Sequence, residues 1–228
     1  GKTLEITGPD TNQTVTISAL STAAGTDINI EGGSVLNIGD STTQTLAGSV
    51  SGTGTLRVIG DGTLNVTGDF NPTFAGGVNL HGNGTVNLSG AAPLASFNVT
   101  TGTTVNVLAG ADITSVGTNL IMTVDNFSNG SQSVINHNAG DVTLGTAAEL
   151  RLGRGTADTT THPQYNLSGG NLDVGRNVSF RADNQGDATF TQTGGTLTNE
   201  RGLIIDPTAA TSTHTYSISG GTLHQAVS

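Results

Sequence analysis

Cysteine and tryptophan are absent from this sequence of 228 residues, and methionine and lysine each occur once, as Met122 and Lys2. Without cysteine the chain has no disulfides and no thiolate metal sites, which is compatible with secretion through an oxidising compartment. Because lysine and methionine are so scarce, long amphipathic helices with charged outer faces have little to be built from. The composition therefore favours strands and turns over helices.

Basic residues are also few, since seven lysine and arginine residues stand against 17 acidic ones, for a formal net charge of −10. No basic cluster could displace counterions from a phosphate backbone, so we expect no nucleic-acid partner. No apolar run approaches the roughly 20 residues that a membrane-crossing helix needs, so we expect no direct membrane insertion. No signal-peptide pattern begins at Gly1, which we interpret as a mature chain or an internal fragment.

Glycine, by contrast, is abundant at 34 residues, and hydrophobic residues make up 33% of the chain. Charged residues are only 11%, a combination that is often found in flexible tracts. A flexible tract, however, would not place leucine, valine or isoleucine at every second position over many short runs. We therefore expect a folded β protein.

Glycine-containing turns repeat along the second half of the chain at intervals of 30, 25 and 26 residues, at Ala139-Gly140, Gly169-Gly170, Gly194-Gly195 and Gly220-Gly221. A period in this range is typical of stacked coils. Counted from the second residue of each pair, apolar residues recur at fixed positions. The predicted columns are Val142, Leu172, Leu197 and Leu223; Ala148, Val178 and Leu203; Leu150, Phe180 and Ile205; and Ile135, Tyr165, Phe190 and Tyr216.

Within each predicted strand the apolar residues lie two apart, so that one face points inward and the other outward. The first half of the chain repeats the same pattern less regularly, in residues 54–58, 62–66, 84–88 and 103–107. We therefore predict an all-β parallel β-solenoid of about nine or ten coils with three short strands each. Residues 1–228 should form one continuous domain, with less regular coils in 1–133 and regular repeats in 134–228.

Residues 50–58, 62–68 and 74–80 resemble the autotransporter-associated, or passenger-associated, β-strand repeat. The Ser168-Gly169-Gly170, Thr193-Gly194-Gly195 and Ser219-Gly220-Gly221 turns are similar to the Ser/Thr-Gly-Gly-x-Leu repeats of large exported bacterial surface proteins. This resemblance implies a right-handed β-solenoid, export, and a stalk, adhesin or passenger role. It supplies no catalytic residue, and the chain lacks a recognisable membrane barrel or sorting tail.

Arg151, Arg181 and Asp206 are predicted to lie in one outward column, which suggests an ion pair between Arg181 and Asp206 across neighbouring coils. We interpret this pair as structural. One exposed pair stabilises a fold by only about 0 to 1 kcal/mol and supplies no second acid for hydrolysis.

Arg176 and Arg201 are predicted to lie one coil apart in the turns between strands. Two like charges at this spacing could hold a sulfate or carboxylate. We favour a solvated turn in which Asp173 and Glu200 act as counterions.

Oxygen-rich loops could bind calcium at Asp183 and Asp187, which flank Gly186, or at Asp125. Residues 169–173 resemble a nonapeptide calcium repeat, but they lack its central glycine and the motif does not recur. We therefore predict no metal site and no cofactor.

The five histidines show no pair at metal-ligand spacing. His137 shares its predicted column with Leu167, Gln192 and Ile218, so we expect a hydrogen-bonded interior histidine and not a catalyst. The others are interpreted as surface or column residues: His81, His162, His214 and His224.

Paired threonines, such as Thr14 with Thr16 and Thr191 with Thr193, raise the alternative of an ice-binding face. These pairs do not stay in one predicted column. Threonine is also favoured on the outer face of strands in general, and we prefer that explanation.

Together these observations predict a secreted, extracellular structural or adhesive protein, a rod of a cell-surface stalk or fibre, without enzymatic activity. The alternative is a carbohydrate-binding or polysaccharide-degrading β-helix protein, with a surface polysaccharide as its partner. An enzyme of that kind would need two carboxylates facing each other in a groove. A binding module would need a defined ligand site, which we would expect in the loops of residues 155–163 or 207–214.

Two features concern modification and assembly. Outward asparagines in Asn-x-Ser/Thr sequons are candidate glycosylation sites: Asn12, Asn65, Asn83, Asn87, Asn98, Asn126, Asn129, Asn166 and Asn177. Residues 2–6 and 222–227 are already alternating strands, without a polar cap. If Ser228 is the natural terminus, the uncapped solenoid ends can pair, and we expect end-to-end self-association that propagates as a fibre. If the chain is a fragment, the same open end continues into further repeats.

Overall fold

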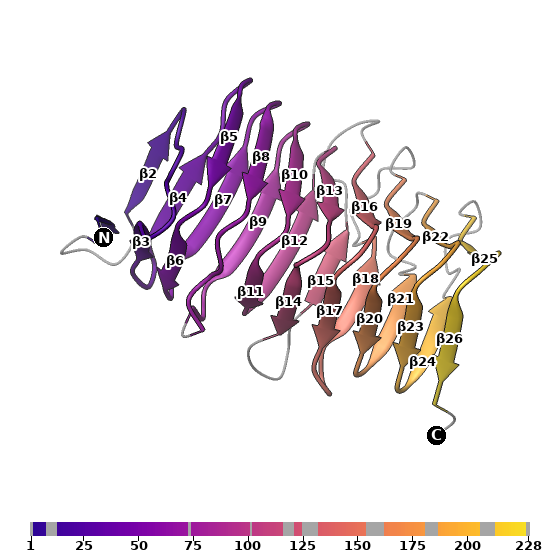
Figure 1. Ribbon diagram of the computed structural model, residues 1–228. Helices are drawn as coiled ribbons and strands as arrows, with labels where there is room; N and C mark the ends of the chain where they lie inside the picture. Colours follow the sequence, from indigo (N-terminus) through magenta and orange to yellow (C-terminus); the bar gives the residue numbers. More distant parts are fainter. Residues whose placement is uncertain are drawn as a thin grey trace.

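The computed structural model describes residues 2–7, 13–72, 74–100, 102–115, 121–124, 132–153, 162–180, 187–205 and 213–226. This part of the chain contains 26 short strands and no helix. Every strand pair between neighbouring coils is parallel, as in β10 with β13 and β20 with β23. The strands stack into a rod with the chain ends at opposite ends (Figure 1).

The largest sheet has nine strands: β2 (Thr14–Ile17), β4 (Val35–Ile38), β7 (Thr55–Ile59), β9 (Gly77–His81), β12 (Ser96–Thr100), β15 (Ile121–Val124), β18 (Glu149–Leu152), β21 (Asn177–Phe180) and β24 (Gly202–Ile205). A second sheet has eight: β5 (Thr43–Leu46), β8 (Thr63–Val66), β10 (Thr85–Leu88), β13 (Thr104–Val107), β16 (Val134–His137), β19 (Gln164–Leu167), β22 (Thr189–Gln192) and β25 (Thr215–Ile218).

The remaining strands form two smaller sheets. Three of them, β1 (Thr3–Ile6), β3 (Asp27–Ile30) and β6 (Ser49–Gly52), lie at the N-terminal end. The other six continue toward the C-terminal end: β11 (Ala91–Leu94), β14 (Asp112–Ser115), β17 (Asp141–Leu144), β20 (Asn171–Val174), β23 (Thr196–Asn199) and β26 (Thr222–Gln225).

The chain is therefore a parallel β-solenoid, and the expected nine or ten coils with three strands each are not confirmed. The regular succession of strands is interrupted between β8 and β9, where the described residues form no strand. Pro72 lies there, and a proline has no N–H to donate to a strand ladder. Phe70 and Phe74 fill the interior at this place instead, with ring centroids 5.3 Å apart in an edge-to-face arrangement.

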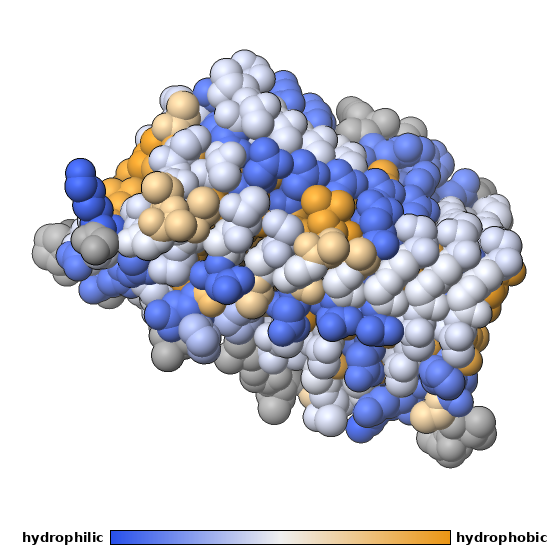
Figure 2. Space-filling view, viewed as in Figure 1, coloured by the Kyte–Doolittle hydropathy of each residue, from blue (hydrophilic) through white to orange (hydrophobic). Residues whose placement is uncertain are grey.

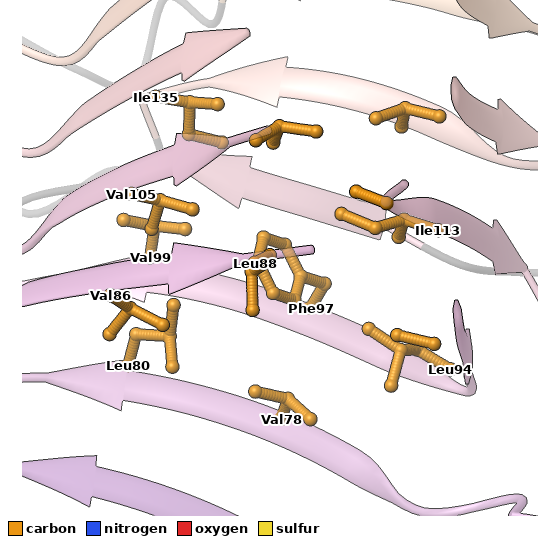
Figure 3. Packing of buried hydrophobic residues seen from close by; sticks show 14 of the residues in the cluster. Val78, Leu80, Val86, Leu88, Leu94, Phe97, Val99, Val105, Ile113 and Ile135 are labelled. Atoms are coloured by element: carbon orange, nitrogen blue, oxygen red, sulfur yellow. The ribbon is translucent and has the colours of Figure 1, made fainter. Parts of the chain in front are cut away.

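A continuous hydrophobic core follows the axis of the rod from Ile6 to Leu197. Most strands alternate between half-exposed and buried residues, as β10 and β13 do. Figure 3 shows inward side chains from different sheets, including Val78, Leu88 and Phe97, meeting in this core. Burying one such side chain contributes about 1.5 to 3 kcal/mol, so the stack of many coils stabilises strands that are only four residues long.

The strand register confirms two of the predicted columns over their whole length. It also confirms the C-terminal pair of each of the two other columns. The confirmed neighbours are Val142, Leu172, Leu197 and Leu223; Ile135, Tyr165, Phe190 and Tyr216; Val178 and Leu203; and Phe180 and Ile205.

The prediction for the coil around β18 is wrong by two residues. Leu150 pairs with Val178, not with Phe180. Ala148, expected beside Val178, lies in the preceding turn, where its N–H donates to the carbonyl oxygen of Gly145 at 2.7 Å. A slip of two residues leaves every inward side chain facing inward, so the apolar pattern could not reveal it.

The glycine pairs have a steric cause, which Gly170 illustrates. Its φ of 74° lies in the left-handed region that favours glycine. A Cβ on Gly170 would also collide with the carbonyl oxygen of Gly140, one coil below. The turns stack so closely that only glycine fits at this position.

The last coil among the described residues exposes apolar side chains. Inward-facing residues of the last coil are exposed there, with Ile218 at 47% and Leu223 at 40%. Figure 2 shows hydrophobic residues at both ends of the rod, on the left near β2 and along the right edge near β25 and β26. No helix within the described ranges is long and apolar enough to cross a membrane.

Candidate functional site

The outer side of the eight-stranded sheet carries two parallel columns of uncharged side chains, mostly threonine and asparagine. They come from the first and third residues of each strand, which alternate with the buried ones. We call this surface the Thr/Asn face. Its first column is Thr43, Thr63, Thr85, Thr104, Val134, Gln164, Thr189 and Thr215, and its second is Thr45, Asn65, Asn87, Asn106, Asn136, Asn166, Thr191 and Ser217.

The asparagines of the second column form a hydrogen-bonded ladder over five coils. Nδ2 of Asn87 donates to Oδ1 of Asn65 at 2.8 Å, and Asn106 donates to Asn87 in the same way at 2.8 Å. Asn136 donates to Asn106 at 3.0 Å, and Asn166 to Asn136 at 3.0 Å. Every amide in the ladder therefore points in one direction, and its rotamer is held by its neighbours.

The sequence alone identifies these asparagines only as outward strand residues, three of them in sequons: Asn65, Asn87 and Asn166. The available signal was the recurrence of Thr-x-Asn in residues 63–65, 85–87 and 104–106. The threonine pairs singled out from the sequence do lie apart, since Thr14 and Thr16 belong to the nine-stranded sheet. Other threonines nevertheless share one column, with Thr63 between Thr43 and Thr85.

Charge distinguishes the Thr/Asn face from the other two sides. No outward position of its two columns holds a charged residue. The six-stranded sheet, by contrast, presents Asp112, Asp141 and Asp173, and the nine-stranded sheet presents Arg57 and Arg151. The face is therefore neutral on a chain that is acidic overall.

His137 is confirmed as an interior, hydrogen-bonded histidine. Its Nε2 donates to the carbonyl oxygen of Gly140 at 3.1 Å, so Nδ1 accepts from the hydroxyl of Tyr165 at 2.9 Å. Burial lowers the pKa of His137, and burial also raises the pKa of Tyr165. Both groups are thus held neutral in the core and have no access to a substrate.

A buried polar cluster that the sequence did not reveal joins β18 and β21. Nη2 of Arg151 lies 3.2 Å from Oε2 of Glu149, and the hydroxyl of Ser179 donates to Oε1 of the same carboxylate. Glu149 is 3% exposed and Ser179 is 1% exposed. Since removing one partner of a buried pair leaves an uncompensated charge, we assign this cluster a role in fixing the two coils together.

This cluster also corrects the expected arginine column, because Arg151 pairs with Ser179 and not with Arg181. The predicted pair of Arg181 and Asp206 lies outside the described residues. Arg176 and Arg201 are neighbours, as predicted: the N–H of Arg201 donates to the carbonyl oxygen of Arg176 at 3.0 Å. Both side chains are exposed.

Of the calcium candidates, only Asp187 and residues 169–173 lie among the described residues. Asp125 and Asp183 lie outside the described residues. Oδ1 of Asp187 accepts a hydrogen bond from the N–H of Thr213 at 2.6 Å. Asp173 lies on β20, in a strand and not in a loop. Among the residues with described positions, no group of three or more histidine or acidic side chains could hold a metal ion.

The other histidines are scattered over the described surface and turns. His81 contacts the hydroxyl of Thr100 at 3.1 Å, and His162 lies 4.0 Å from Asp187. Nδ1 of His214 accepts from a backbone N–H, and His224 is exposed on β26. No two of them form a shared site.

The candidate glycosylation sites differ in their surroundings. Asn65, Asn87 and Asn166 take part in the ladder, and Nδ2 of Asn98 donates to Oδ1 of Asn79 at 2.7 Å. Asn83 is exposed in a turn, and Asn177 is half-buried at the start of β21. The other three lie outside the described residues: Asn12, Asn126 and Asn129.

No family model, no curated protein and no solved structure matches this chain. The resemblance to autotransporter-associated repeats therefore rests on the short motifs alone.

Proposed function

We propose that this chain is a secreted, non-catalytic structural or adhesive rod of a cell-surface stalk or fibre. The observation that carries the proposal is the continuous hydrophobic core along the rod, which gives a stiff element whose length grows with the number of coils. We further propose that the solenoid is right-handed, as almost all parallel β crossovers are.

End-to-end self-association is the assembly that we propose for the rod. The exposed apolar side chains of the last coil, among them Leu203, Ile205 and Ile218, continue columns that are fully buried in the coils before them. A second copy stacked on this end would bury the same surface. Its contact would be head-to-tail, so it would propagate as a fibre.

Sedimentation velocity over a wide concentration range, with electron microscopy of the same samples, tests this assembly. We expect linear oligomers that grow with concentration and that disappear in Ile218→Lys. Thr198→Lys, which places the same charge on an outer side of the rod, should assemble like the wild type. A monodisperse monomer at high concentration would refute end-to-end assembly.

The proposed location has its own test. Antibody labelling of intact, unpermeabilised cells of the native host should detect the chain at the surface, and mild protease treatment of those cells should remove the signal. Labelling that requires permeabilisation would contradict the location.

A carbohydrate-active protein remains the second candidate, and the neutral Thr/Asn face favours its binding form. A polysaccharide-degrading enzyme would release reducing ends from a panel of neutral and acidic polysaccharides. Turnover on any of them would replace the structural proposal with an enzymatic one.

A further inference from the structure

The Thr/Asn face has the properties of a prepared binding surface. Its two columns repeat at the coil spacing of about 4.8 Å, and they lie about 7 Å apart along the strands. The hydrogen-bonded ladder from Asn65 to Asn166 fixes the amide groups before any ligand arrives. Ordering these side chains therefore costs little when a ligand binds.

The chemistry of the face excludes most kinds of partner. It has no lysine or arginine with which to hold a nucleic acid or an acidic polysaccharide, and the chain's charge of −10 would repel both. It also has no aromatic residue or arginine, which dominate the energetics of protein interfaces. Hydroxyl and amide groups in a neutral array complement a ligand that is itself neutral and rich in hydroxyls.

The repeat of the face sets the form of that ligand. Every coil of the face except that of Val134 offers a hydroxyl or amide group in both columns, so a ligand that uses the whole face must repeat along the rod axis. An extended polysaccharide does so, because its sugar residues follow one another at a distance close to the coil spacing. Many weak contacts along one chain then add up through multivalency.

We propose that the Thr/Asn face binds an extended, neutral polysaccharide that lies along the rod axis. This inference adds a ligand to the proposed extracellular rod. It rests on that proposal only in assuming that the chain lies outside the cell, where it can contact a polysaccharide.

Binding can be measured by co-sedimentation of the chain with crystalline cellulose, chitin and insoluble mannan as neutral probes, and with calcium alginate gel as the acidic one. We expect retention on at least one neutral probe and none on alginate. The triple variant Thr63→Val, Thr85→Val and Thr104→Val keeps the side-chain shape and removes three hydroxyls. It should bind about tenfold more weakly or worse.

The matched control carries the same three changes on the six-stranded sheet, as Thr114→Val, Thr143→Val and Thr198→Val. It should bind like the wild type. Equal loss in both triple variants, no binding of the wild type to any neutral probe, or preference for alginate would overturn the proposal. So would shaping of ice crystals by the wild type without polysaccharide binding, since that would assign the face to ice.

A measurement on the unmodified chain covers the case in which the variant fails to fold. Titration with the soluble neutral oligomer that matches the retained probe should shift the side-chain amide NMR signals of the ladder asparagines, and the hexamer should bind more tightly than the trimer. Shifts confined to other residues would refute the assignment. End-to-end assembly of the variant with Thr63, Thr85 and Thr104 changed to valine should match that of the wild type. The proposal of a rod and the proposal of its ligand are therefore tested independently.

Discussion

Phe190 is the residue through which the stacked interior of the rod can be tested most directly. It is fully buried, and its ring lies 5.2 Å from that of Tyr165 at an interplanar angle of 1° and 5.0 Å from that of Tyr216 at 19°. Phe190→Ala would leave a cavity, which costs about 3 to 5 kcal/mol in a core. This range already includes lost contacts, and because Phe190 gives up two stacked pairs of about 0.5 to 1.5 kcal/mol each, we expect a loss in its upper part, about 4 to 5 kcal/mol.

Phe190→Leu separates the two contributions. Leucine keeps most of the buried volume but gives up both stacked pairs, so its cost should be about 1 to 2 kcal/mol. The difference between the two variants then measures the cavity alone.

Tyrosine fluorescence during urea unfolding is a suitable assay, because the chain has two tyrosines and no tryptophan. Both tyrosines are the stacking partners of Phe190, so the signal reports on this column. The midpoint should fall in each variant while the dependence on urea stays the same. A loss below about 2 kcal/mol for Phe190→Ala, or equal losses for both variants, would show that the column does not stack as described.

Four further predictions concern single sites. Burial lowers the pKa of His137 in the folded chain below the ordinary histidine value of 6.5, so the unfolded chain takes up a proton at a higher pH than the folded chain does. The unfolding free energy should therefore fall as the pH decreases below about 6.5. In His137→Gln, urea unfolding at a series of pH values should lack this contribution. Asn106→Ala breaks two ladder hydrogen bonds and should cost about 1 to 2 kcal/mol by urea unfolding, whereas the exposed Asn83→Ala should stay within about 0.5 kcal/mol. Gly170→Ala meets both a positive φ and a backbone oxygen and should lower the unfolding free energy by more than about 1 kcal/mol, while Gly202→Ala, whose added Cβ has open space around it, should change it little. In a host with N-glycosylation the intact mass should exceed 22.8 kDa, with Asn83 among the occupied sites; a mass equal to that of the bare chain would contradict this.

The buried positions of this fold could be predicted from the sequence because they hold apolar residues at regular intervals. The alternation in residues 171–174 and the recurrence of Leu172 and Leu197 suffice to predict parallel strands stacked in register. The interior position of His137 followed from the same columns. A column position predicts burial whatever residue fills it, which is why a histidine could be placed correctly among apolar neighbours.

The irregular turns could not be predicted in this way. Pro72 and the aromatic pair beside it replace a strand without breaking the apolar composition of the coil. The two-residue slip at Leu150 conserves the inward pattern and changes which residues meet across the two coils. In the observed register Arg151 lies opposite Ser179, and the Ser179 hydroxyl reaches Glu149, two residues before Arg151 on the same strand.

The same limit applies to function in a solenoid. Inward residues decide whether coils stack, but partners meet the outward columns, and these are defined only once the register of every coil is known. A two-residue error places Arg151 beside the wrong neighbour, and a one-residue error would bury the asparagine ladder. The surface around Thr85 and Asn87 is thus defined by the register of the neighbouring coils. A single repeat does not show whether these residues belong to a continuous neutral surface or to an ordinary strand exterior. For this reason the Thr/Asn face is best tested by changing one column at a time, with the same residues on another side of the rod as the control.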